Sequence, residues 1–127
     1  MATILLDTNI LIDQLRGLPA ARTVLAAALD RGDRLVASVL SKVELLAGML
    51  PGEERATRRM IEGLEWIEVD DAIAERAGEL GRGFMRSHRA IDIADFVLAA
   101  TAQLLGAELW TRNVRHFPMF PELEAPY

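Results

Sequence analysis

Short apolar segments alternate with longer helical patterns along this chain, and that alternation limits the possible fold more than any other feature. Segments with the length and composition of strands occur at residues 3–7, 34–38, 66–69 and 108–111. Strands separated by helices predict a parallel sheet, because neighbouring parallel strands need a long crossover connection. For 127 residues we expect one α/β domain, residues 1–127, with helices on both faces of the sheet.

Most of the expected helices have recognisable ends. Asp7 or Thr8 is suited to cap the first helix, and Pro19 is suited to the first turn of the second. Gly32 and Gly106 follow helical patterns, as glycines that end helices do. The expected helices span residues 9–16, 19–31, 41–50, 53–63, 71–87 and 92–105.

The composition excludes several kinds of protein. The chain has no cysteine, which excludes disulfides, thiolate metal sites and a cysteine nucleophile. No basic leader precedes the first apolar run and no run approaches ~18 residues, so we expect a cytoplasmic protein without a membrane span. The net charge of −5 argues against binding nucleic acid through overall charge. Lys42 is the only lysine among 14 cations, and the arginines are suited to clamp phosphate bidentately.

Acidic residues stand where strands are expected to give way to helices. Asp7 follows the apolar run at residues 4–6, and Glu44 follows the second strand by a short turn. Asp92 and Asp95 open the last helix. The carboxyl ends of parallel strands share one edge of the sheet, where α/β proteins bind ligands. Carboxylates gathered there repel one another unless a cation lies between them, so we expect Mg²⁺ or Mn²⁺ and a phosphate ester substrate.

Each acid also has a purely structural interpretation. Ser41 and Glu44 have the spacing of a capping box. Asp92 could cap its helix with Asp95 in the first turn, and Asp7 could cap the first helix. The combination favours a metal site, because Asp95 lies on a nearly apolar helix and a buried carboxylate needs a partner.

Other polar residues lie close to these acids in the sequence. Arg112 and Arg115 follow the last strand and are the best candidates for contacts with phosphate. A surface or packing role is expected for His88 and His116. Small polar residues that could orient the carboxylates or hold metal-bound water are Thr8, Asn9, Ser38, Thr111 and Asn113.

Four motifs in order give the chain a family likeness. They are LLDTNILID at 5–13, SVLSKVELLAG at 38–48, ADFVLAATAQLLG at 94–106 and LWTRNVRHF at 109–117. With them the chain resembles the PIN-domain ribonucleases of the VapC toxin type. The resemblance implies a three-layer α/β/α fold whose central parallel sheet has four or five strands. It also implies an Mg²⁺- or Mn²⁺-dependent endoribonuclease.

The resemblance also assigns roles to particular acids. It places metal ligands and catalytic groups at Asp7, Glu44 and Asp95. The family commonly has a fourth acid just after the last strand, where this chain has none. Asp92, Asn113 or His116 could take its place, and the sequence leaves open whether one or two ions bind.

The resemblance further implies partners: a cognate antitoxin, an RNA substrate such as transfer or ribosomal RNA, and a second copy of the chain in a homodimer. An antitoxin of this type inserts an arginine or lysine into the acidic pocket. Apolar residues on two helical surfaces could serve these contacts or could simply be core. The first surface comprises Ile10, Leu11, Leu15, Val24, Leu25 and Leu29, and the second comprises Leu46, Met49 and Leu50.

Two other functions fit parts of the pattern. A receiver-type signalling domain has a similar length and an acidic pocket, but it needs an acidic pair after the first strand and a lysine after the fifth. Here Asp7 stands alone and Lys42 is misplaced. A non-catalytic PIN-like binding module that kept the pocket is the other alternative, because the fourth acid is missing.

Overall fold

The computed structural model describes residues 1–127 and has the expected alternation of strands and helices. The strands are β1 (Thr3–Leu6), β2 (Arg34–Ser38), β3 (Glu65–Ile67) and β4 (Glu108–Trp110). The helices are α1 (Thr8–Leu15), α2 (Pro19–Asp30), α3 (Val39–Ala47), α4 (Glu54–Gly63), α5 (Asp71–Phe84) and α6 (Ile93–Leu105). A short 3₁₀ helix, η1 (Val114–His116), follows β4.

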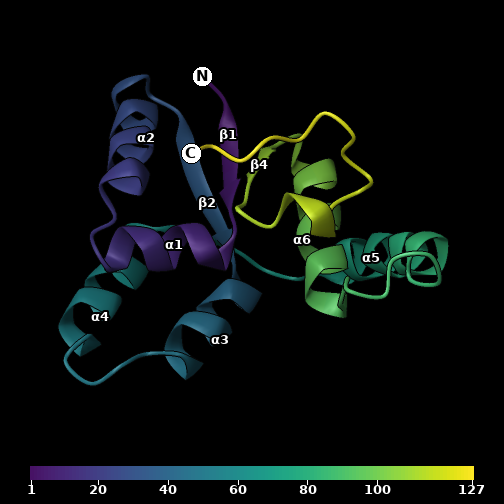
Figure 1. The fold of residues 1–127 in the computed structure, drawn as a ribbon, viewed down its shortest axis with the longest axis horizontal. Coiled ribbons are helices and arrows are strands. Elements are labelled where there is room, and N and C mark those ends of the chain that lie inside the picture. Colours follow the sequence, from purple (N-terminus) through teal and green to yellow (C-terminus); the bar gives the residue numbers. More distant parts are fainter.

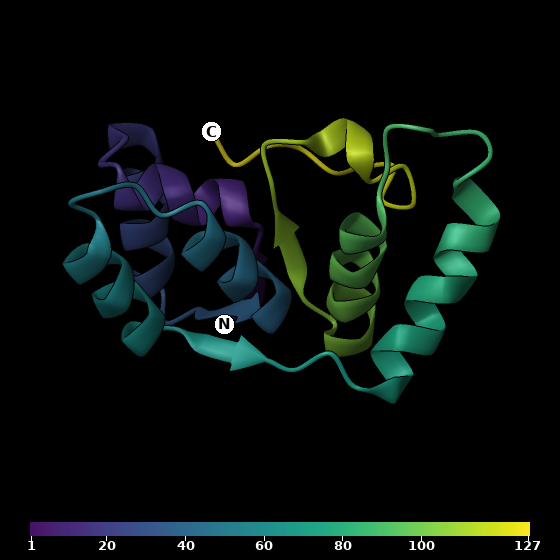
Figure 2. The same ribbon diagram turned by 90° about the horizontal axis from the view of Figure 1, so that it is seen from below.

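The four strands form one parallel sheet in the order β3-β2-β1-β4. Strand β1 is internal: Leu5 pairs with Val36 of β2 and with Leu109 of β4. Helices α1 to α4 lie on one side of the sheet, and α5 and α6 lie on the other (Figures 1 and 2). The expected three-layer α/β/α fold with a parallel sheet is therefore confirmed, with four strands.

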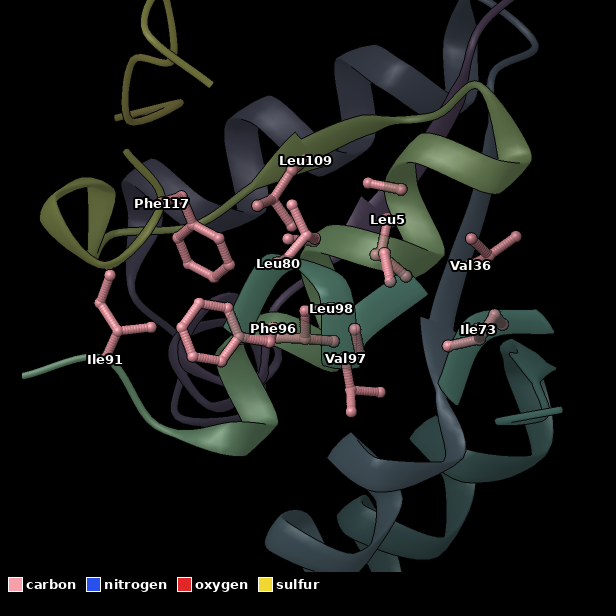
Figure 3. Close-up of a cluster of buried hydrophobic side chains, with 14 residues drawn as sticks. Leu5, Val36, Ile73, Leu80, Ile91, Phe96, Val97, Leu98, Leu109 and Phe117 are labelled. Atoms are coloured by element: carbon pink, nitrogen blue, oxygen red, sulfur yellow. The ribbon is translucent and has the colours of Figure 1, made fainter. Parts of the chain in front are cut away.

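Two hydrophobic clusters attach these layers to the sheet. Alternate strand residues point to opposite faces. Leu5, Val36 and Leu109 belong to the cluster under α5 and α6, which also contains Phe96 (Figure 3). The other cluster lies under α1, α2 and α3 and comprises Ile4, Leu6, Ile10, Leu11, Leu25, Ala28, Ala37 and Leu45.

Helix α6 is the most deeply buried helix. Seven consecutive residues, from Phe96 to Ala102, are buried, which explains its nearly continuous apolar sequence. Gly106 ends the helix with a φ of 63°, a left-handed conformation that glycine adopts without strain. The short turn after it sends the chain directly into β4, so α6 runs back along the sheet and begins at the carboxyl edge.

Some helix boundaries differ from the sequence expectation. Helix α3 begins at Val39 rather than Ser41, because the Ser38 hydroxyl accepts the Leu40 N–H and caps the helix. The alternative in which Ser41 and Glu44 form a capping box is therefore wrong. Helix α5 ends at Phe84, before the expected Ser87. None of the helices is both long and apolar enough to cross a membrane.

Candidate active site

The four acids meet in a pocket of about 270 Å³ at the carboxyl edge of the sheet. Asp7 reaches it from the end of β1 and Glu44 from α3. Asp92 and Asp95 reach it from the start of α6. The pocket is also lined by Thr8, Asn9, Ile12, Ala94, Leu98, Asn113 and His116. Residues more than 100 positions apart converge here because β1 and β4 are neighbours in the sheet.

Asp7 is the most enclosed of the acids, with 7% of its surface exposed. Its Oδ1 accepts the Thr8 backbone N–H at 2.7 Å, so Asp7, rather than Thr8, caps α1. Its Oδ2 accepts the Thr111 hydroxyl at 2.8 Å and the Asn9 side-chain amide at 3.3 Å. Three donors thus hold a buried carboxylate in one orientation.

Thr111 connects the two central strands at this edge. It is fully buried, and its hydroxyl accepts the Asn113 backbone N–H at 3.0 Å while it donates to Asp7. The Asn9 amide lies 3.4 Å from the same hydroxyl oxygen. Asn9, Thr111 and Asp7 therefore form a network in which each polar group has a partner.

Asp92 and Asp95 cap α6, as one of the structural interpretations expected. Asp92 Oδ1 accepts the Asp95 N–H at 3.1 Å, and Asp95 Oδ2 accepts the Asp92 N–H at 3.2 Å. The same Asp95 oxygen lies 3.1 Å from His116 Nδ1. Capping and pocket roles are compatible here, because the helix begins at the pocket and the two carboxylates line it.

Glu44 approaches from the opposite wall. Its Oε1 accepts the Thr8 hydroxyl at 3.3 Å, which ties α3 to the start of α1. The residue as a whole is exposed, so Glu44 forms the rim of the pocket rather than its floor.

The pocket raises the pKa values of three of its acids, Asp7, Glu44 and Asp95. Burial raises the pKa of Asp7, although the hydrogen bonds from Thr111, Thr8 and Asn9 oppose that rise. Partial burial of their carboxyl groups also raises the pKa values of Glu44 and Asp95, and repulsion from the neighbouring acids adds to both. A cation bound among them would offset this repulsion and lower the pKa values of these groups.

The donors suit a hard divalent cation, although no three acidic or histidine side chains lie close enough together to hold one ion directly. Mg²⁺ commonly binds one or two carboxylates and keeps several waters. Such an ion needs carboxylate oxygens and room for its waters, and the pocket has both. The residues therefore fit a hydrated Mg²⁺ or Mn²⁺ ion.

Some residues expected near the acids lie elsewhere. Ser38 is fully buried and caps α3, outside the pocket. Arg112 is paired with Asp13 and stacked on the Tyr127 ring, and neither it nor Arg115 lines the pocket. Their phosphate contacts stay predictions.

Two interpretations of His116 followed from the sequence, and one of them made it a candidate for the place of the missing fourth acid. The other expected it at the surface or in packing, yet it lines the pocket beside Asp95. Its position in LWTRNVRHF, just after the last strand, was the available signal. Asn113, from the same segment, also lines the pocket.

Known proteins match this chain over almost its whole length. The family model described as the PIN domain matches residues 4–121. Ribonuclease VapC19 of Mycobacterium tuberculosis is 46% identical, over 97% of this chain and 98% of that protein. Ribonuclease VapC10 of the same organism is 41% identical, over 98% and 92%. A solved structure described as a toxin–antitoxin complex from Klebsiella pneumoniae contains a chain that is 29% identical, with a TM-score of 0.78 and 98% of both chains covered.

Proposed function

This chain belongs to the PIN domain family, and from that premise we propose that it is a metal-dependent endoribonuclease of the VapC toxin type. One observation carries the proposal: the buried Asp7 carboxylate is held by three donors in a pocket that it shares with Glu44, Asp92 and Asp95. Relatives named as ribonucleases favour neither a receiver-type signalling domain nor a non-catalytic module.

Asp7, Glu44 and Asp95 would hold a hydrated Mg²⁺ or Mn²⁺ ion, in part through its waters, with Asp92 adding negative charge at the same edge. When bound, the ion supplies positive charge to the scissile phosphate and lowers the pKa of a coordinated water. Thr111 and Asn9 keep Asp7 in position, and Thr8 does the same for Glu44. The attacking water forms a bond to phosphorus as the bond to the leaving ribose oxygen breaks. A pocket carboxylate takes the water's proton, and Glu44, at the rim of the pocket, is the candidate for that role; the leaving ribose oxygen takes a proton from solvent.

The proposal is tested by cleavage of structured RNA with Mn²⁺ or Mg²⁺ and then with EDTA. We expect metal-dependent cuts that disappear in Asp7→Asn and Asp95→Asn, whereas Asp30→Asn, at an exposed position at the end of α2, cuts like the wild type. Cuts that persist in EDTA, or in both pocket variants, contradict the proposal. Sequencing the new 5′ ends from transfer and ribosomal RNA then identifies the target.

Ion binding has a readout that does not depend on activity. A ligand at a hundred times its Kd stabilises the folded protein by about 2.7 kcal/mol. For a chain of this size that raises the melting temperature by about 10 °C. Mn²⁺ should produce this rise in the wild type but not in Asp7→Asn. An equal rise in both would place the ion elsewhere.

We further propose that a cognate antitoxin binds the apolar groove between α1, α2 and α4. Of the two apolar surfaces in the sequence, the first is mostly core, since Ile10, Leu11 and Leu25 are buried. Leu29 is 61% exposed at the groove's edge, and Arg22 and Arg59 also line the groove. A groove with an exposed leucine and two arginines suits an amphipathic segment that carries acidic residues. On the second surface Leu46 and Leu50 are exposed and remain available for a contact. The expected homodimer stays a prediction, which analytical ultracentrifugation would check.

A further inference from the structure

One face of α1 holds Arg112 at two points. The Arg112 backbone N–H donates to Asn9 Oδ1 at 3.1 Å, and its guanidinium Nη1 lies 3.4 Å from Asp13 Oδ2. Asn9 and Asp13 are four residues apart in the helix and therefore share a face. Because the helix is rigid, the two contacts fix both the position and the direction of Arg112, which lies in no helix or strand.

Tyr127 contacts both Asp13 and the guanidinium of Arg112. Its hydroxyl donates to the same Asp13 oxygen at 2.8 Å, and its ring centre lies 4.5 Å from the Arg112 guanidinium carbon. The last residues of the chain return from η1 toward β1 and α1 to reach this place (Figure 1). Burial and the neighbouring Asp13 carboxylate raise the pKa of Tyr127 to about 12, so its hydroxyl remains a donor at neutral pH.

The contact reaches the active site through the orientation of the Asn9 amide. Asn9 Oδ1 accepts the Arg112 N–H, so its NH₂ group is turned toward Asp7 Oδ2, 3.3 Å away. If Arg112 moved away, the amide would be free to turn over and present its oxygen to the carboxylate. That reversed orientation replaces a donor with a repulsive acceptor beside Asp7.

We propose that Asp13, Arg112 and Tyr127 form a clamp that sets the orientation of the Asn9 amide and thereby holds Asp7 in place. Asp13 and Tyr127 are then positioning residues for RNA cleavage, a role that rests on the function proposed above. The clamp also gives Arg112 a role other than phosphate binding, because its guanidinium is occupied by Asp13 and the tyrosine ring.

The test compares variants that open the clamp with one that opens a similar contact elsewhere. Tyr127→Ala and Asp13→Ala remove the clamp, whereas Tyr127→Phe keeps the ring against Arg112 and loses only the hydroxyl. Glu65→Gln is the control, since the exposed Arg34–Glu65 pair lies at the starts of β2 and β3, away from the pocket. The two readouts are hydrogen exchange of the Arg112 backbone amide and the kcat and KM of RNA cleavage with Mn²⁺.

We expect both alanine variants to expose the Arg112 amide to faster exchange and to lower kcat about tenfold with little change in KM. Tyr127→Phe should lie between them and the wild type, and Glu65→Gln should match the wild type. The clamp is refuted if both alanine variants keep normal Arg112 exchange. It is also refuted if they melt earlier but retain kcat below the melting range, which is the behaviour of a stabilising contact alone.

The proposed function can fail separately from the clamp. A wild-type protein that cleaves no RNA with Mn²⁺ contradicts the endoribonuclease proposal. Hydrogen exchange at Arg112, together with the resonances of the Asn9 side-chain amide, still decides whether the clamp exists in that case.

Discussion

Replacing Thr111 with valine removes the hydroxyl that holds Asp7 while keeping the shape of a fully buried side chain. The substitution leaves no cavity, because valine and threonine have nearly the same volume. It deletes the 2.8 Å hydrogen bond to Asp7 Oδ2 and takes away the acceptor of the Asn113 N–H. Thr101→Val is the matched control: Thr101 is equally buried, but its hydroxyl donates to the Val97 carbonyl within α6.

The size of the effect follows from the partners of the two hydroxyls. A hydrogen bond to a charged group contributes about 1.5–3 kcal/mol, so Thr111→Val should lower the free energy of unfolding by about 2–3 kcal/mol. That corresponds to a melting temperature about 8–12 °C lower for a chain of this size. Thr101→Val should cost at most about 1 kcal/mol, because a bond between neutral groups contributes less.

The stability that Thr111→Val loses should depend on pH in a definite direction. The Thr111 hydrogen bond lowers the pKa of Asp7, so the stability it contributes is present at neutral pH and fades as Asp7 becomes protonated. The difference between wild type and Thr111→Val should therefore be largest near pH 7 and should shrink toward pH 4.

Thermal melts in EDTA at a series of pH values measure these differences, and RNA cleavage with Mn²⁺ measures their consequence. We expect Thr111→Val to lose about 10- to 100-fold in kcat, and Thr101→Val to retain wild-type activity. If the two variants melt within 2 °C of each other at pH 7, on the scale of about 4 °C per kcal/mol, Thr111 does not hold an ionised Asp7 and the reasoning fails.

Three other predictions concern separate parts of the molecule. In EDTA, Asp95→Asn should be more stable than the wild type by an amount that grows as pH rises above 4, because the raised pKa of Asp95 makes its ionisation unfavourable in the folded state. If the difference in melting temperature between variant and wild type is the same at pH 4 and at pH 7, this prediction is refuted. Ser41→Ala should raise the free energy of unfolding, measured in urea melts, by about 1 kcal/mol without changing cleavage, because the buried Ser41 hydroxyl has no hydrogen-bond partner. A loss of stability would show that this hydroxyl does make a hydrogen bond. Leu29→Glu should weaken inhibition by the cognate antitoxin while leaving cleavage unchanged, as titration of activity would measure; unchanged inhibition would place the antitoxin elsewhere.

Local pattern in the sequence was enough to predict the layers of the fold and the position of most elements. The period of the apolar residues changes between strand and helix, and that change depends on residues a few positions apart. The start of α3 was missed because a serine stands both at residue 38 and at residue 41 and either is able to cap a helix. The structure selects Ser38, whose hydroxyl accepts the Leu40 N–H.

The acids of the site were predicted more fully than the groups around them. Asp7 stands at a strand end and Asp92 and Asp95 at a helix start, whereas Glu44 lies inside α3, the helix that directly follows β2. Parallel topology brings strand ends and the helices that follow them to one edge. The place of His116 depended on how the turn after β4 folds back over α6, which no periodicity encodes.

The amino-acid sequence by itself determined that this protein is a parallel α/β chain with carboxylates along one edge of its sheet, because hydrophobic period and chain connectivity are local properties. Only the tertiary structure decided which donor meets which carboxylate. The bond from Thr111 to Asp7 and the contact between Asp13 and Tyr127 join residues more than 100 positions apart. Such contacts depend on the register of β1 against β4 and on the path of the last residues, which are set by packing across the whole molecule.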